Sequence, residues 1–162
     1  MMMTPLKYAV LHHKGDEIAS IVERENEIIT IEERQAMFKL ACEIGNKLTK
    51  VRVARLLLPQ EIATEQVAAL LYEYMTAISS NYFGGGTVKG ACHRAWAQAI
   101  LEQAPPPFSR DEPDFILDAE KIKDIRWMFQ RMGLNSLEQV VQFILNYRPN
   151  LSLNRTCLRQ AG

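Results

Sequence analysis

The run Gly84-Gly85-Gly86 is the feature that most constrains the fold of this chain. In residues 64–80, before the glycines, and in residues 88–103, after them, apolar side chains recur three and four positions apart, as on one face of a helix. Each glycine disfavours a helix by about 1 kcal/mol relative to alanine, so three in succession mark a break. The sequence therefore predicts a helical hairpin that turns at the glycines and forms the centre of the fold.

Other helices are predicted from their end signals. Thr30-Ile-Glu-Glu33 and Ser136-Leu-Glu-Gln139 both have the pattern of a capping box, which satisfies the first free amides of a helix. Gly45 weakens the helix that follows Thr30 and is a candidate for its end, and Gly133 follows a helical stripe and suits the left-handed position that ends a helix. One short helix is also expected over residues 16–24. Pro59 is expected to begin the helix before the glycines, and Asp118 to cap the helix over residues 118–132.

Two regions remain ambiguous from the sequence. Residues 50–58 alternate like a strand at Val51 and Val53, yet Leu48, Val51, Arg55 and Leu58 also continue a helix. Near the N-terminus, residues 7–13 and 27–30 are candidates for a short strand pair. The predicted fold class is mainly α, a single-domain bundle of five to six helices, with that strand pair as an option.

The length of 162 residues suits one domain with a sizeable core. Pro105-Pro106-Pro107 lies in a stiff segment over residues 104–114, which we expect to be a linker. It separates a helical core with its N-terminal segment, residues 1–103, from a C-terminal helical hairpin, residues 115–148. That hairpin is expected to pack on the core, and residues 149–162 are expected to form a tail.

The sequence predicts a cytoplasmic protein that does not enter a membrane. No apolar run approaches the roughly 20 residues of a transmembrane helix, and the first residues lack the apolar core of a signal peptide. Three cysteines, an odd number without paired spacing, indicate reduced thiols.

The glycine-rich segment lacks the residues of a nucleotide-binding loop. Gly85 and Gly90 have the outer spacing of a phosphate loop, but Ala91 and Cys92 stand where lysine and serine or threonine are needed. An anion bound by free amides near the glycines remains an open alternative. Zinc-ligand spacings and a nucleophile elbow are also missing, so no catalytic residue, metal or cofactor is predicted. If the protein is an enzyme, its pocket is expected around Thr87, Lys89, His93 and Trp96.

Charges are arranged in stretches along a chain whose net charge is zero. Asp16 to Glu33 contains seven acidic residues and one basic residue, whereas Arg34 to Gln60 contains six basic residues and one acidic residue. The basic stretch either neutralises the acidic stretch within the fold or steers a charged partner. The candidate residues for partner binding are Lys47, Lys50, Arg52 and Arg55.

The C-terminal hairpin also has the outline of a helix-turn-helix. Phe129 stands where that motif needs a small residue, and the second helix has no lysine or arginine before Arg148. Arg126 and Arg131, on the first helix, are the candidate nucleic-acid contacts. A hairpin that completes the core is favoured, because DNA recognition needs cations near the phosphates.

These features predict a small cytoplasmic protein-binding or regulatory module with an unknown protein partner, for example an inhibitor or immunity-type protein. Nucleic-acid binding by the C-terminal hairpin is the alternative, and an enzyme with a pocket near Gly84–Gly86 is the next. A homodimer is a further option, because apolar helix faces often outnumber those that one small core can cover.

Overall fold

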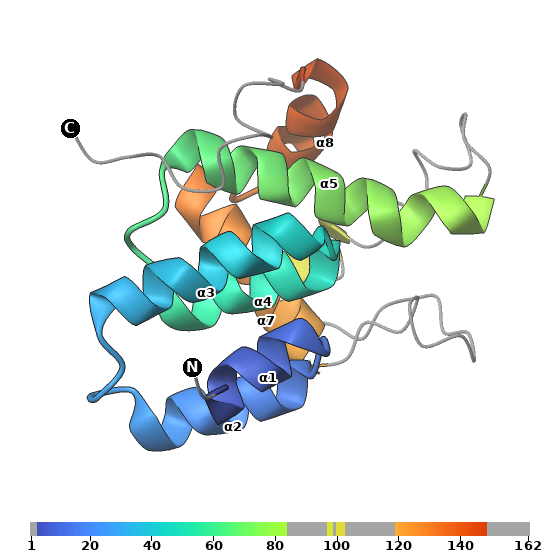
Figure 1. Cartoon of the computed structure of the whole chain (residues 1–162). Coiled ribbons are helices and arrows are strands. Elements are labelled where there is room, and N and C mark those ends of the chain that lie inside the picture. The colour runs from blue at the N-terminus through green and yellow to red at the C-terminus, as the bar shows by residue number, and fades with distance from the viewer. Residues whose placement is uncertain (1–2, 84–96, 99, 103–118, 149–162) are drawn as a thin grey trace. The chain divides into compact units, whose positions relative to one another are not determined.

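The computed structural model describes residues 3–83, 97–98, 100–102 and 119–148, with side chains omitted at 76–83. These residues are mainly helical and contain no strand, which confirms the predicted mainly α class. The helices that can be delimited are α1 (Pro5–Leu11), α2 (Gly15–Glu25), α3 (Ile31–Ile44), α4 (Lys47–Leu57), α5 (Thr64–Phe83), α7 (Ala119–Met132) and α8 (Leu137–Asn146) (Figure 1). The described part thus already holds seven helices, so a bundle of five to six is not confirmed.

The contacts divide the chain into two compact units. The N-terminal unit contains the described residues up to Gln66, and the C-terminal unit contains those from Val67 to Arg148. The division falls inside α5 and not in the proline-rich segment 104–114. That segment, the predicted turn at Gly84–Gly86 and residues 149–162 lie outside the described residues.

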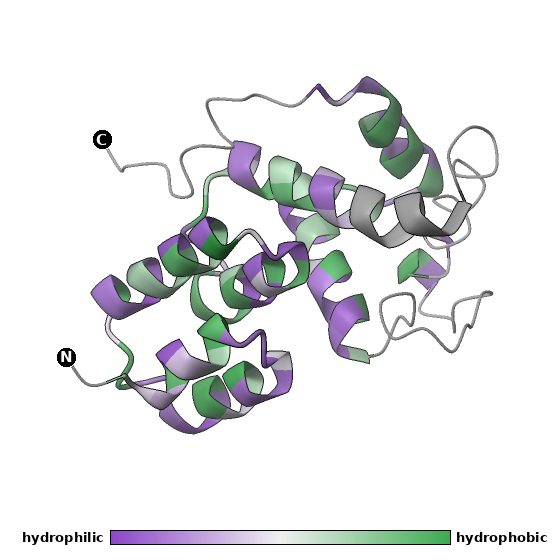
Figure 2. Ribbon diagram, turned by 45° about the vertical axis from the view of Figure 1, so that its right-hand side comes forward, coloured by the Kyte–Doolittle hydropathy of each residue, from purple (hydrophilic) through white to green (hydrophobic). Residues whose placement is uncertain are grey.

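The N-terminal unit is built from α1 to α4. α1 packs against α2 and α3, and α4 packs against α2 and α3. In Figure 2 hydrophobic and hydrophilic segments alternate along these helices, and the apolar side chains that they bury form the core of this unit. The largest side chains enclosed here are Val10, Ile18, Phe38, Leu57 and Leu58.

The expected N-terminal strand pair is not confirmed. Residues 7–13, its first member, are mostly helical in α1, because Thr4 accepts a hydrogen bond from the Lys7 amide (3.1 Å) and Pro5 occupies the first turn. Residues 27–29, most of its second member, form the turn between α2 and α3. The ambiguous residues 50–58 belong mainly to α4, whose first amides are capped by the Asn46 side chain.

Several predicted helix ends are confirmed. The Thr30 hydroxyl accepts from the Glu33 amide (3.1 Å), and Gly45 ends α3 with a φ of 82°. Gly133 follows α7 with a φ of 71°, and Ser136 with Gln139 forms a complete capping box at the start of α8. The expected start at Pro59 is wrong, since residues 59–62 form a turn and α5 begins at Thr64. The expected cap Asp118 lies outside the described residues.

The C-terminal unit contains α5 from Val67 onward, helical residues at 97–98 and 100–102, and the α7–α8 hairpin. The rings of Tyr72 in α5 and Tyr147 after α8 lie 5.0 Å apart, so α8 packs on α5. The enclosed apolar side chains include Leu71, Met75, Ile125, Met128 and Phe129.

Candidate functional site

A short polar turn joins α1 to α2 and exposes three successive side chains, His12, His13 and Lys14. The turn closes through the Lys14 amide, which donates to the Ala9 carbonyl (2.8 Å), while His13 takes a left-handed φ of 56°. The Tyr8 ring lies beside His12, with centroids 4.2 Å apart, and the Lys14 ammonium lies 5.4 Å from the Tyr8 centroid. These contacts fix the turn against α1.

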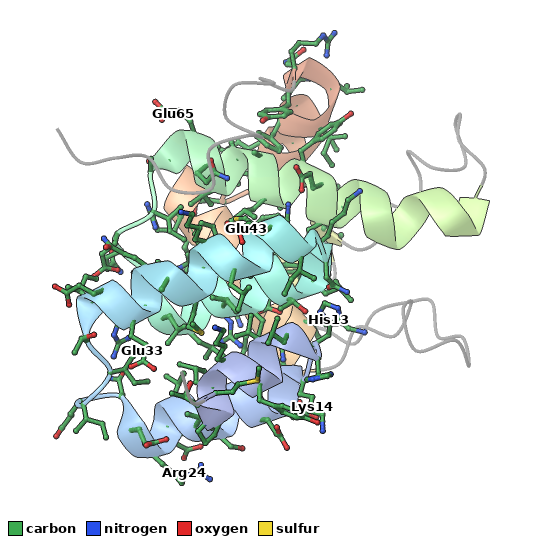
Figure 3. The ribbon with its side chains drawn as sticks, viewed as in Figure 1. His13, Lys14, Arg24, Glu33, Glu43 and Glu65 are labelled. Carbon is green, nitrogen blue, oxygen red and sulfur yellow. The ribbon has the colours of Figure 1, made fainter. Side chains whose placement is uncertain are left out.

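The same turn is tied to the start of α4. The His13 Nδ1 and Thr49 Oγ1 atoms are 3.1 Å apart, within hydrogen-bonding distance, and the Thr49 side chain is buried. Lys47 and Lys50 flank Thr49 within the first turn of α4; Lys47 is exposed and Lys50 is half-buried. We call the group formed by Lys14, Lys47 and Lys50 the basic end of the N-terminal unit. Figure 3 labels His13 and Lys14 at this end of the helices.

The charges in the first turn of α4 are opposite in sign to those that a helix usually favours there. A helix N-terminus carries a partial positive charge and favours acidic side chains nearby. The first turn of α4 contains no acidic residue and two lysines, Lys47 and Lys50. The acids nearest to Lys14 in the sequence are Asp16 and Glu17, in the first turn of α2. An anionic group at the α4 terminus would therefore meet both the helix dipole and the lysines.

Arg52 and Arg55, the other two predicted partner-binding residues, are placed differently. Arg52 is only 8% exposed, and its guanidinium lies over the start of α2: a Cβ added at Gly15 would come within 2.5 Å of Arg52 Nη1. Arg52 is therefore part of the packing between α4 and α2. Arg55 is half-buried in the last turn of α4.

The basic stretch also contributes a structural arginine. The Arg34 guanidinium donates to the carbonyls of Ile29 (3.1 Å) and Leu57 (3.0 Å), and to the carbonyl and side-chain oxygen of Asn26. Asn26 is the C-cap of α2 and Leu57 is the last residue of α4, so one cation satisfies carbonyls at two helix C-termini. Part of the positive charge thus stabilises the fold.

The C-terminal unit has a shallow pocket of about 200 Å³ beside the turn between α7 and α8. Apolar side chains and a polar edge share its lining: Ile100, Leu101, Arg126, Phe129, Gln130, Leu134 and Asn135. Arg126, a predicted nucleic-acid contact, is therefore at a pocket edge. The second such residue, Arg131, has its guanidinium carbon 5.9 Å from the Trp127 ring centroid. The expected enzyme pocket residues Thr87, Lys89, His93 and Trp96 lie outside the described residues.

One tyrosine beside α8 has altered acid–base behaviour. Burial raises the pKa of Tyr147 above its ordinary value, and the nearby Glu73 carboxylate and Tyr72 act in the same direction. All three residues belong to the packing between α5 and α8, where the neutral phenol is favoured.

Within the described ranges, no three His, Cys, Asp or Glu side chains gather as a metal ion would require. The helices of those ranges include none with the length and apolar character needed to cross a membrane. No protein-family model, curated protein or solved structure matches the chain.

Of the site residues, Lys47 and Lys50 were indicated by the basic stretch, whereas His13 and Lys14 were missed. The available signal was Thr4-Pro5, which is a helix start and places residues 12–14 in the turn after a short helix. The pairing of that turn with Thr49, 36 positions away, has no signal in a single sequence.

Proposed function

We propose that the protein is a small binding or regulatory module that holds an acidic surface of a protein partner at its basic end. An inhibitor or immunity-type protein, which neutralises its partner by covering it, is one form of this function. The observation that carries the proposal is the contact between His13 and Thr49, because it joins the lysine of one turn to the two lysines of α4.

The backbone around these lysines favours binding without reorganisation. Lys14 follows a turn closed by backbone hydrogen bonds, and Lys47 and Lys50 belong to a capped helix. A preformed arrangement of cations lowers the entropic cost of association. Exposed charges of this kind mainly raise the association rate and make it salt-dependent, so the partner is expected to be captured more strongly at low salt.

The local charge pattern favours a protein over nucleic acid. Asp16 and Glu17 are exposed next to the basic end, and they would repel a continuous phosphate backbone. A protein surface can present separate acidic and basic groups that complement both signs. In the C-terminal hairpin, α8 contains no lysine or arginine, which gives the nucleic-acid alternative no added support.

The test is a pull-down from native cell lysate with the tagged protein, at low and moderate salt and with nuclease treatment. The double variant Lys14→Glu/Lys47→Glu is compared with Lys7→Glu/Lys39→Glu, which changes the net charge equally on α1 and α3. We expect the first variant to capture at least about tenfold less of a stoichiometric, nuclease-resistant partner than the wild type does. An effect of this size is expected when several charges at the rim of an interface are reversed together. The control variant should keep it.

Both variants should unfold within about 3 °C of the wild type, because Lys14, Lys39 and Lys47 are exposed and Lys7 is half-buried, and charges at such positions contribute little to stability. Arg52 is left unchanged because its burial would mix binding with folding. Equal loss of partner in the two variants, or capture of nucleic acid alone, would contradict the proposal.

A further inference from the structure

Helix α8 carries more apolar surface than the described residues of its unit bury. Six of its ten residues are apolar in the sequence LEQVVQFILN, yet Val140 is the only residue of α8 that is buried. Figure 2 shows α8 as a largely apolar helix. Leu145 is 60% exposed, whereas the other apolar residues of α8 are buried or half-buried.

One apolar series of α8 is used for packing inside the C-terminal unit. Val140, Phe143 and Tyr147 follow one another at spacings of three and four, so they share a face. The Phe143 and Tyr147 rings lie 5.3 Å apart, and Tyr147 lies against Tyr72 of α5. This inner face accounts for the attachment of α8 to α5.

A second series lies on a different face. Glu138, Val141 and Leu145 are separated by three and four positions, the spacing of a helix–helix seam. Arg148 lies beyond the end of α8, after the extended C-cap Tyr147. Glu138 and Arg148 are exposed, and Val141 is half-buried. Arg148 follows the C-cap, and its Nη1 donates back to the Leu145 carbonyl (3.2 Å), which keeps its cation at the C-terminal end of this series. We call these four residues the outer seam.

The outer seam is complementary to itself. Its order is acid, apolar, apolar, base, and it is symmetric about position 143. When two such helices pair in antiparallel orientation about a two-fold axis, Val141 faces Leu145 of the second copy. Glu138 then faces Arg148 of the second copy, and the axis repeats both pairs. Antiparallel helices also oppose their dipoles favourably. We infer that a second copy of this chain docks along the outer seam to form a homodimer.

The dimer is expected to be weak and concentration-dependent. A contact limited to about three helical turns is smaller than the roughly 800 Å² per partner of a standard stable interface. Each apolar pair is flanked by an ion pair at the edge of the contact, where charges fix register and orientation more than they add affinity.

The test is sedimentation equilibrium of the full-length chain over a wide concentration range. The wild type should show reversible dimerisation. Glu138→Arg and Arg148→Glu should each weaken it at least about tenfold, because each places like charges opposite one another twice in the dimer. An equimolar mixture of the two variants should recover a dimer of wild-type strength, since every arginine of one chain then faces a glutamate of the other.

Mixing distinguishes docking from misfolding, because a chain that had lost α8 would not be rescued by its counterpart. Gln142→Arg, on a polar position of α8, is the matched control and should dimerise as the wild type does. Leu145→Asp should remain monomeric with an unchanged circular dichroism spectrum. A wild type that stays monomeric at every concentration, or a dimer that the seam variants do not affect, overturns the proposal.

Discussion

Among the described residues, Tyr147 is one whose titration should affect stability. Its pKa is raised in the folded chain by burial, by Glu73 and by Tyr72, whereas the unfolded chain has the ordinary value of 10.0. Below that pH the phenol is neutral in both states, and its contribution to stability is complete. Above it the unfolded chain loses the proton first, so the free energy of unfolding falls as the pH rises toward the folded pKa.

The measurement is urea unfolding at several pH values between about 9 and 11.5, a window that spans the ordinary tyrosine pKa. Tyr147→Phe keeps the ring against Tyr72 and Phe143 but removes the titrating group. We expect the variant to lose less stability over this range than the wild type. Parallel curves for the two proteins would show that Tyr147 does not titrate differently in the fold.

Helix α3 ends at Gly45, which has a left-handed backbone conformation. Gly45 has a φ of 82°, and a Cβ built on it would meet no atom within 4 Å. Gly45→Ala therefore meets no steric clash. It should lower the free energy of unfolding by about 1 kcal/mol, the cost of placing alanine in the left-handed conformation. Gly45→Asn should cost less, because asparagine tolerates this conformation better. Urea unfolding of both variants measures the difference, and equal or negligible losses would contradict the assignment.

Helix ends were predictable because their signals are local. Thr30, Gly45, Gly133 and Ser136 act within four residues of their own position, and the structure has each in its expected role. The start of α1 at Thr4-Pro5 has an equally local signal. The structure has residues 7–11 in this helix, so the strand that was an option over residues 7–13 is not confirmed.

The nature of α4 could not be predicted in the same way. Four consecutive residues, Val51 to Ala54, are buried, because α4 is packed against both α2 and α3. A helix enclosed on most sides loses the period of 3.6 that identifies an amphipathic helix. The same enclosure buries Arg52, which the charge pattern alone had grouped with the surface residues Lys47 and Lys50. Burial of this kind depends on contacts between distant segments.

At the scale of the whole chain, α5 is the only delimited helix that crosses the division between the two units. Each unit has its own enclosed side chains, such as Phe38 in the N-terminal unit and Phe129 in the C-terminal unit. The division runs through a helix that no glycine or proline interrupts over residues 64–83. The division therefore results from tertiary contacts and has no compositional marker.

Two variants can test whether the units unfold separately. Arg34→Met removes the hydrogen bonds to two helix C-termini and should destabilise the N-terminal unit by about 2 kcal/mol. Phe129→Ala empties an enclosed position and should destabilise the C-terminal unit by about 3 kcal/mol. In a Trp96→Phe background, Trp127 is the only tryptophan, and its fluorescence reports on the C-terminal unit.

Because each unit has its own core, we expect Arg34→Met to shift the denaturation followed by far-ultraviolet circular dichroism and to leave the Trp127 transition unchanged. Phe129→Ala should shift the Trp127 transition. The part of the circular dichroism transition that comes from the N-terminal unit should stay where it is in the wild type. If both probes shift equally in both variants, the chain unfolds in one cooperative transition, and α5 couples the two cores. The two units would then describe how contacts are distributed in the chain, and they would not unfold separately.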